Sequence, residues 1–112
     1  MMQNTKIKYV LLLPRTYNDG SEVPARLLDG MMQELFELAE GYCIAGTVHG
    51  AYRMKDGTKK SDKLWQIWIA IYDNEIDALH QLVAKFGKLL GQESMYLERT
   101  GGYVDFIPPQ SS

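Results

Sequence analysis

Residues 64–72 alternate in side-chain character more regularly than any other part of the chain. In a β-strand, successive side chains point to opposite sides, so Ile67, Ile69 and Ile71 would share one face and Trp68 would lie on the other. The isoleucine face needs a covering layer to remove it from water. This segment therefore predicts one strand of a sheet that packs against helices.

Two other segments carry apolar residues at steps of three and four, the spacing of amphipathic helices. One lies between Pro24 and Gly41, and the other between Asp73 and Gly91. Proline fits a first helical turn, aspartate caps a helix start, and glycine ends a helix without steric cost. Short apolar or alternating runs predict further strands at residues 6–13, 42–54, 94–99 and 103–107.

The predicted elements follow the order strand, helix, strand, strand, helix, strand, with one more strand at the end. This is the order of ferredoxin-like domains. We therefore predict an α+β fold, a ferredoxin-like βαββαβ sandwich in which two helices lie on one face of a mainly antiparallel sheet, with an extra C-terminal hairpin strand. The 112 residues suit a single domain. Its ordered core spans about residues 6–107, and two prolines begin a flexible tail at 108–112.

Charge and cysteine content exclude several classes of function. Twelve basic and 14 acidic residues give a net charge of −2, so no overall basic field favours nucleic acid or an anionic membrane. The single cysteine, Cys43, allows neither an internal disulfide nor a thiolate metal cluster. No apolar stretch is long enough to span a bilayer, and the polar start does not resemble a signal peptide. We expect a cytoplasmic protein without a metal or a cofactor.

The face of strand 64–72 that carries Trp68 also carries Gln66, Ala70 and Tyr72, and alternate apolar residues of the first strand extend it. Monomers rarely expose a contiguous apolar patch of this kind. We therefore predict a homo-oligomer in which a second copy covers this open face. The alternatives are a bound ligand, the terminal hairpin, or a reversed strand that places Trp68 beneath the helices.

Strand 42–54 contains several small residues. Strict alternation would put Ile44 and Gly46 on one face, and Cys43 and His49 on the other. Cys43 and His49 would lie about 20 Å apart along the strand, too far for a catalytic pair. We expect Cys43 to be buried or half-buried. The small neighbours of His49 leave room for a packed partner or for a bound molecule.

Two groups of residues are candidates for binding. The first is a set of polar and aromatic side chains on the sheet: His49, Arg53, Gln66, Trp68 and Glu98. The second is a predicted polar turn at residues 55–63, where residues 53–63 carry five basic and two acidic side chains, a net charge of +3. The lysines of this turn would bind an anion, or else they would only keep an exposed loop solvated: Lys55, Lys59, Lys60 and Lys63.

Short motifs carry a resemblance to a known group. Gly91-Gln92-Glu93-Ser94 leads from a helix into a strand, and Gly50 and Tyr52 precede Asp56-Gly57 in a hairpin. With this element order over residues 6–99, the chain resembles small bacterial ferredoxin-like proteins classed as domains of unknown function. The resemblance implies a fold and no activity. The element order is also similar to that of PII-like signalling proteins and dimeric α/β-barrel monooxygenases, by analogy of fold.

The uncovered aromatic face and the basic hairpin favour a small binding or regulatory module. It would self-associate through the open sheet face and bind a small anionic ligand or a protein partner. The absence of a catalytic motif favours a non-enzyme. Two alternatives stay open: a structural subunit of a larger assembly, or a small enzyme of the dimeric α/β-barrel type with a site between sheet and helices, lined by His49, Gln66, Trp68 and Glu98.

Overall fold

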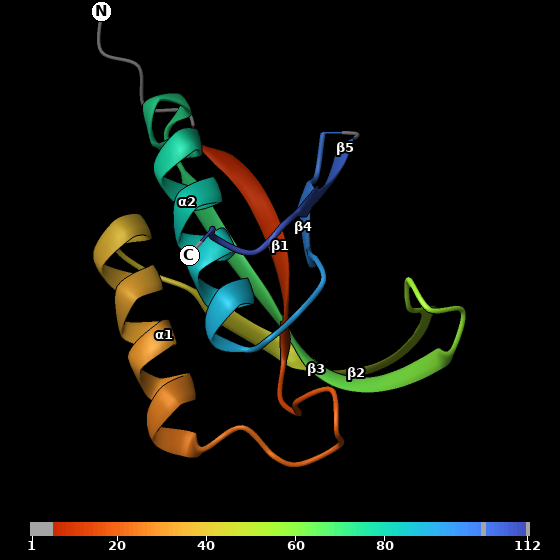
Figure 1. Ribbon diagram of the computed structural model, residues 1–112. Coiled ribbons are helices and arrows are strands. Elements are labelled where there is room, and N and C mark those ends of the chain that lie inside the picture. The colour runs from red at the N-terminus through yellow and green to blue at the C-terminus, as the bar shows by residue number, and fades with distance from the viewer. Residues whose placement is uncertain (1–5, 102, 112) are drawn as a thin grey trace, which may run out of the picture.

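The structure is a computed structural model that describes residues 6–101 and 103–111 (Figure 1). Five strands and two α-helices follow one another along the chain: β1 (Ile7–Pro14), α1 (Ala25–Ala39), β2 (Cys43–Arg53), β3 (Lys59–Ile71), α2 (Ile76–Leu89), β4 (Met95–Arg99) and β5 (Tyr103–Ile107). A short 3-10 helix, η1 (Asp73–Glu75), leads into α2. Both predicted helices and the first four predicted strands are present.

The strands form one sheet in the order β2-β3-β1-β4-β5, and every pair of neighbours is antiparallel. The two helices lie side by side on one face of the sheet (Figure 1). The predicted α+β class is therefore confirmed, and the arrangement is compatible with a ferredoxin-like domain. The second face of the sheet carries no helix among the described residues.

One apolar core fills the space between the sheet and the helices. Ile67, Ile69 and Ile71 are buried there, whereas Trp68 keeps 41% of its surface exposed. The prediction that the isoleucines face the helices is confirmed. The buried side chains of β1 and of the two helices complete the core: Tyr9, Leu11, Leu13, Leu28, Met31, Leu35, Leu79, Val83 and Phe86.

A β-bulge in β2 overturns the strict alternation predicted for this strand. Ile44 pairs with Ile67, but Gly46 pairs with the next residue along β3, Gln66. Ala45 is therefore the extra residue, and a bulge changes which side chains face each way. Ile44 lies on the helix side of the sheet and Gly46 on the open side, because their partners do.

The bulge also separates Cys43 from His49. Cys43 pairs with Trp68 and shares its open face, whereas His49 pairs with Lys63 on the opposite face of the sheet. The expectation of a buried or half-buried thiol is wrong, because Cys43 is exposed. β2 is an edge strand, and none of its residues is buried.

The turn between β2 and β3 is shorter than predicted. The backbone N–H of Met54 donates to the carbonyl of Thr58 at 2.7 Å, so the turn spans only a few residues. The Asp56 carboxylate holds it by accepting from the Thr58 N–H and hydroxyl, at 2.9 and 2.7 Å. Three of the four lysines assigned to a turn lie instead on β3: Lys59, Lys60 and Lys63.

The helices end in left-handed backbone. At the end of α1, Glu40 and not Gly41 takes this conformation, with φ of 63°, and the Glu40 N–H donates to the Phe36 carbonyl at 2.7 Å. At the end of α2 the predicted glycine, Gly91, does so with φ of 64°. No helix among the described residues is long and apolar enough to cross a membrane.

The end of the chain lies over α2 (Figure 1). The Gln110 N–H donates to the Ala84 carbonyl at 2.9 Å, and Pro109 lies beside Gly87. These contacts hold the described part of the predicted flexible tail against the helix. Ser112, its last residue, lies outside the described residues.

Candidate functional site

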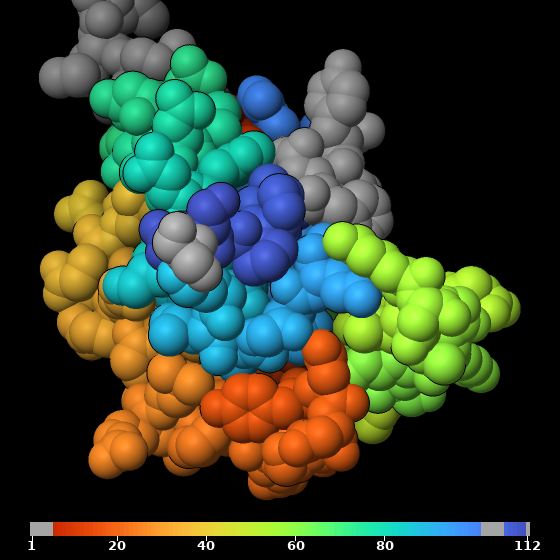
Figure 2. Space-filling model, in the orientation of Figure 1, coloured from red at the N-terminus to blue at the C-terminus, as the bar shows by residue number. Residues whose placement is uncertain are grey.

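The β2–β3 hairpin continues past the end of β1 and curves away from the helices (Figures 1 and 2). β1 ends at Pro14, which pairs with Leu64, while β3 runs back to Lys59. The loop between α2 and β4 approaches the part of the hairpin that extends beyond the end of β1. The extended hairpin, the end of β1 and this loop together enclose a cavity of about 400 Å³.

Two hydrogen bonds join the hairpin to the loop. The Tyr52 hydroxyl donates to Gln92 Oε1 at 3.2 Å, and the Lys55 backbone N–H donates to Glu93 Oε1 at 3.2 Å. Both acceptors lie about forty positions along the chain from their donors. The cavity is therefore a product of tertiary contact between distant segments, and these two bonds fix its width.

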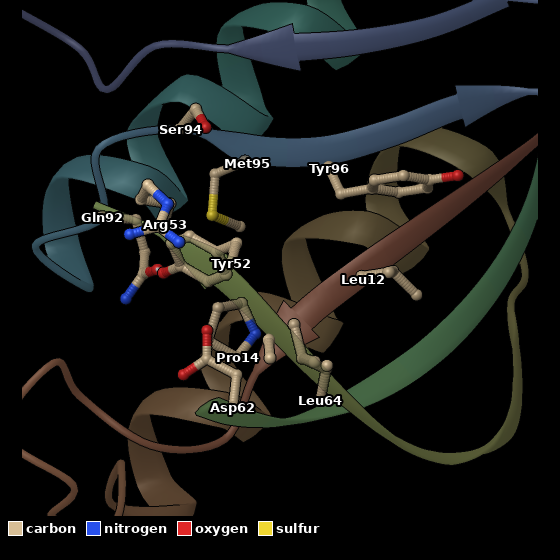
Figure 3. Close-up of a pocket in the computed structure, with 12 residues that line it drawn as sticks. Leu12, Pro14, Tyr52, Arg53, Asp62, Leu64, Gln92, Ser94, Met95 and Tyr96 are labelled. Carbon is tan, nitrogen blue, oxygen red and sulfur yellow. The ribbon is translucent and has the colours of Figure 1, made fainter. Parts of the chain in front are cut away.

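The wall of the cavity is apolar along the sheet and polar near the hairpin. Leu12 pairs with Tyr96, and Pro14 pairs with Leu64, so these four side chains come from the open face (Figure 3). The polar contributions come from the hairpin and the α2–β4 loop: Tyr52, Arg53, Asp62, Gln92 and Ser94. Such a combination of apolar wall and few polar groups is typical of small-molecule sites.

A buried ion pair lies at the polar end. The Lys60 ammonium donates to Asp62 Oδ1, and the two side chains are 10% and 2% exposed. A buried carboxylate without a cation would carry a large desolvation cost, which Lys60 offsets. The pair itself carries no net charge, yet it presents a carboxylate to the cavity.

Tyr52 connects this ion pair to Gln92. Burial, followed by the negative charge of Asp62 and its hydrogen bond, raises the pKa of Tyr52 to about 12. The phenol is therefore a neutral donor at physiological pH. Gln92 is 4% exposed, and its Nε2 donates to Asn18 Oδ1 at 3.2 Å and to the Leu90 carbonyl at 3.3 Å. These donations orient Gln92 so that its Oε1 faces Tyr52.

Three of the five predicted sheet candidates share the open face. Trp68 and Glu98 each pair with Val10 and so form one row across β3, β1 and β4. Gln66 lies in the adjacent row, opposite Leu12. The Lys8 ammonium lies 3.9 Å from the centroid of the Trp68 ring. These residues lie beside the cavity without lining it, and the space between the sheet and the helices is occupied by the core.

The structure separates the other two candidates. Arg53 lines the cavity, and its Nη1 donates to the Gly57 carbonyl at 2.6 Å. His49 lies in a different, shallow groove with Thr16, Ser61 and Lys63. The predicted set of five is therefore not one constellation, because β2 turns His49 to the face opposite Gln66 and Trp68.

The predicted anion-binding lysines do not form one cluster either. The Lys60 ammonium forms an ion pair with Asp62, and the Lys63 ammonium lies 3.7 Å from Glu22 Oε1. Lys55 and Lys59 are exposed on the hairpin. Anion binding there stays a prediction, now confined to the two exposed lysines.

Four of the five residues that make the cavity polar were not among the candidates from the sequence: Tyr52, Asp62, Gln92 and Ser94. Asp62 and Gln92 are both buried in the structure. One signal was available for Asp62. It lies two positions after Lys60, so the two opposite charges would share a face if the segment were a strand and not a turn. Nothing local marks Gln92, because its role depends on a hairpin forty residues away.

No protein-family model and no curated protein sequence matches the chain. Among solved structures, the fold is similar to that of a phage SAM lyase in complex with S-methyl-5'-thioadenosine. The TM-score is 0.64 at 12% sequence identity, and the match covers 96% of this chain and 93% of the other. At this identity the likeness concerns the fold.

Proposed function

We propose that this protein is a small-molecule-binding module on a ferredoxin-like scaffold, which self-associates through its open sheet face and binds its ligand in the hairpin cavity. The observation that carries the proposal is the cavity itself, with an apolar wall on one side and the polar cluster of Tyr52, Asp62 and Gln92 on the other. Its volume of about 400 Å³ lies in the range of small-molecule pockets.

The ligand that fits these walls best has a flat ring and a few polar groups. The rings of Tyr52 and Tyr96 offer aromatic surface, and Leu12 and Leu64 offer apolar contact. A nucleoside thioether has this composition. The phage SAM lyase of similar fold was solved in complex with such a compound, S-methyl-5'-thioadenosine, which supports the choice of this class as the first to test.

Calorimetric titration of the purified chain with S-methyl-5'-thioadenosine tests the ligand. Ser94→Trp would fill the cavity from its rim, so we expect it to abolish binding. Ser61→Trp is the matched control, since Ser61 is exposed and lines the groove of His49 instead. Binding that survives Ser94→Trp, or is lost equally in both variants, would contradict the cavity as the site.

Self-association is supported by the uncovered apolar surface. Trp68 on the open face is 41% exposed, and no residue of the edge strand β2 is buried in the single chain. A second copy is the simplest cover for such a face in a soluble protein.

Light scattering after size exclusion should give a mass above 12.8 kDa. Trp68→Glu should reduce it to the monomer, whereas Phe36→Glu, at an exposed apolar position on α1, should not. A monomeric wild-type protein would refute the oligomer.

A second candidate function is catalysis in the same cavity, which the similarity in fold to a phage SAM lyase favours. Incubation of the protein with S-adenosylmethionine, followed by chromatography, would reveal S-methyl-5'-thioadenosine if the chain has this activity. Product formed by wild type and not by Ser94→Trp would assign the chemistry to the cavity. Binding without product would leave the module as a non-enzyme.

A further inference from the structure

The polar end of the hairpin cavity contains more hydrogen-bond acceptors than its own phenol can serve. The Tyr52 hydroxyl faces two of them, Gln92 Oε1 at 3.2 Å and the Asp62 carboxylate, which also contributes to the raised pKa of Tyr52. A hydroxyl has one proton, so it donates to one acceptor at a time. Lys60 serves the Asp62 carboxylate through Oδ1 alone, so further lone pairs of this carboxylate stay available to a group of the ligand.

The surroundings fix both acceptors in place. Gln92 cannot turn its amide without losing the bonds from its Nε2 to Asn18 and Leu90. Asp62 is held through its Oδ1 by Lys60. Both side chains are buried, and each already has one donor, Lys60 for Asp62 and Tyr52 for Gln92, so a ligand donor would use the remaining lone pairs of these fixed oxygens.

The charges at this end decide which donor fits. Lys60 neutralises Asp62, while Arg53 adds a positive charge to the cavity wall and Glu93, close enough to raise the pKa of Tyr52, adds a negative one. A ligand ammonium would therefore add an unbalanced positive charge to a set of charges that already offset one another. A ligand carboxylate would place its oxygens against the oxygens of Asp62 and Gln92. A neutral hydroxyl avoids both conflicts and donates one hydrogen bond to these oxygens.

We propose that Asp62 and Gln92 form a subsite for a neutral hydroxyl group of the ligand, such as those on a sugar, with the Tyr52 hydroxyl shared between the two acceptors. The inference deepens the proposed function and rests on the same cavity. It replaces the expected anionic ligand at this end by an uncharged hydrogen-bond donor.

Three probes that share one ring separate the possibilities: benzyl alcohol, benzylamine and benzoate. Each is titrated into the full chain at neutral pH while NMR follows the Gln92 side-chain amide. Benzyl alcohol should bind about fivefold or more tightly than benzoate and benzylamine, the difference that one net hydrogen bond makes. Equal binding of the three, tighter binding of benzoate, or no shift of the Gln92 amide with any of them would overturn the subsite.

Two variants test the assignment of acceptors. Gln92→Met removes one acceptor and should reduce the preference for the alcohol to about twofold or less, whereas Ser61→Ala, in the separate groove of His49, should leave it unchanged. Tyr52→Phe removes the competing donor at an exposed position, so the preference should persist or increase. This second variant keeps the test decisive if the buried Gln92 does not tolerate replacement. Loss of the preference in Tyr52→Phe would mean that the phenol, and not the acceptors, recognises the ligand.

The probes also separate this inference from the proposed ligand. Binding of S-methyl-5'-thioadenosine without any preference among the three probes would uphold the proposed function and refute the hydroxyl subsite. A preference for benzyl alcohol without binding of the thioether would uphold the subsite and refute the ligand class.

Discussion

Lys60→Met should destabilise the protein far more than a lysine replacement on a surface strand usually does. The variant leaves Asp62, whose side chain is 2% exposed, as a buried carboxylate without its cation. Removing one partner of a buried pair costs about 3–5 kcal/mol. Because the Tyr52 hydroxyl still stabilises the carboxylate, we expect a loss at the lower end, about 3 kcal/mol.

Lys63→Met is the matched control, three positions further along β3. Its ammonium lies 3.7 Å from Glu22, and the two side chains are 39% and 75% exposed. An exposed pair of this kind contributes about 0.5 kcal/mol or less. The two variants remove the same chemical group from the same strand, so they differ mainly in the burial of the partner carboxylate.

Urea denaturation followed by circular dichroism measures both variants, and a thermal melt gives a second reading. At this chain length a loss of about 3 kcal/mol corresponds to a fall in Tm of about 12 °C. The double variant Lys60→Met, Asp62→Leu should recover much of the loss, because replacing a whole buried pair by apolar groups is often neutral. Equal losses in Lys60→Met and Lys63→Met would refute the burial of the ion pair and with it the polar end of the cavity.

Three further outcomes follow from the structure. Gly91→Ala should cost about 1 kcal/mol in urea denaturation, because an alanine is strained at φ of 64°, whereas Gly41→Ala should be nearly neutral. The pKa of Tyr52, raised to about 12, means that the unfolded chain ionises this phenol first, near pH 10. The stability that this group gives the folded state is therefore present below about pH 10 and is lost as the pH rises to about 12, as chemical denaturation across that range would show by a steeper loss of stability in wild type than in Tyr52→Phe. Leu35→Ala should cost about 3 kcal/mol because Leu35 is fully buried in α1, whereas Leu89→Ala, at a position 47% exposed, should cost less than about 1 kcal/mol in the same assay.

The patterns that the chain repeats many times were sufficient to predict its elements. The core was predicted correctly from the alternation around Ile67, Ile69 and Ile71 and from the apolar stripes of both helices. These patterns are reliable because buried side chains recur at the same spacing along the whole of a helix or a strand. The prediction was less accurate where one residue changes the outcome. The bulge at Ala45 has no strong local signal, yet it moves Cys43 to the open face and Ile44 to the helix side.

The β2–β3 hairpin shows why the candidate site was also difficult to predict from the sequence. Residues 55–63 are polar, contain Asp56-Gly57 and include four lysines, and this composition led to the prediction of a turn. In the structure three of the four lysines lie on β3, and Lys60, which pairs with Asp62, becomes buried. Charge alone did not distinguish these outcomes, because the burial of Lys60 depends on where the hairpin curves.

The sequence by itself determined the α+β class, the core and the uneven faces of the sheet, since these follow from periodic burial of apolar side chains along each element. The tertiary structure alone decided that there is a cavity and which residues make it polar. Its two walls, Tyr52 on the hairpin and Gln92 on the α2–β4 loop, are forty residues apart and meet through one hydrogen bond. Such a contact depends on the curvature of the hairpin and the length of a loop, and neither leaves a repeating pattern in the chain.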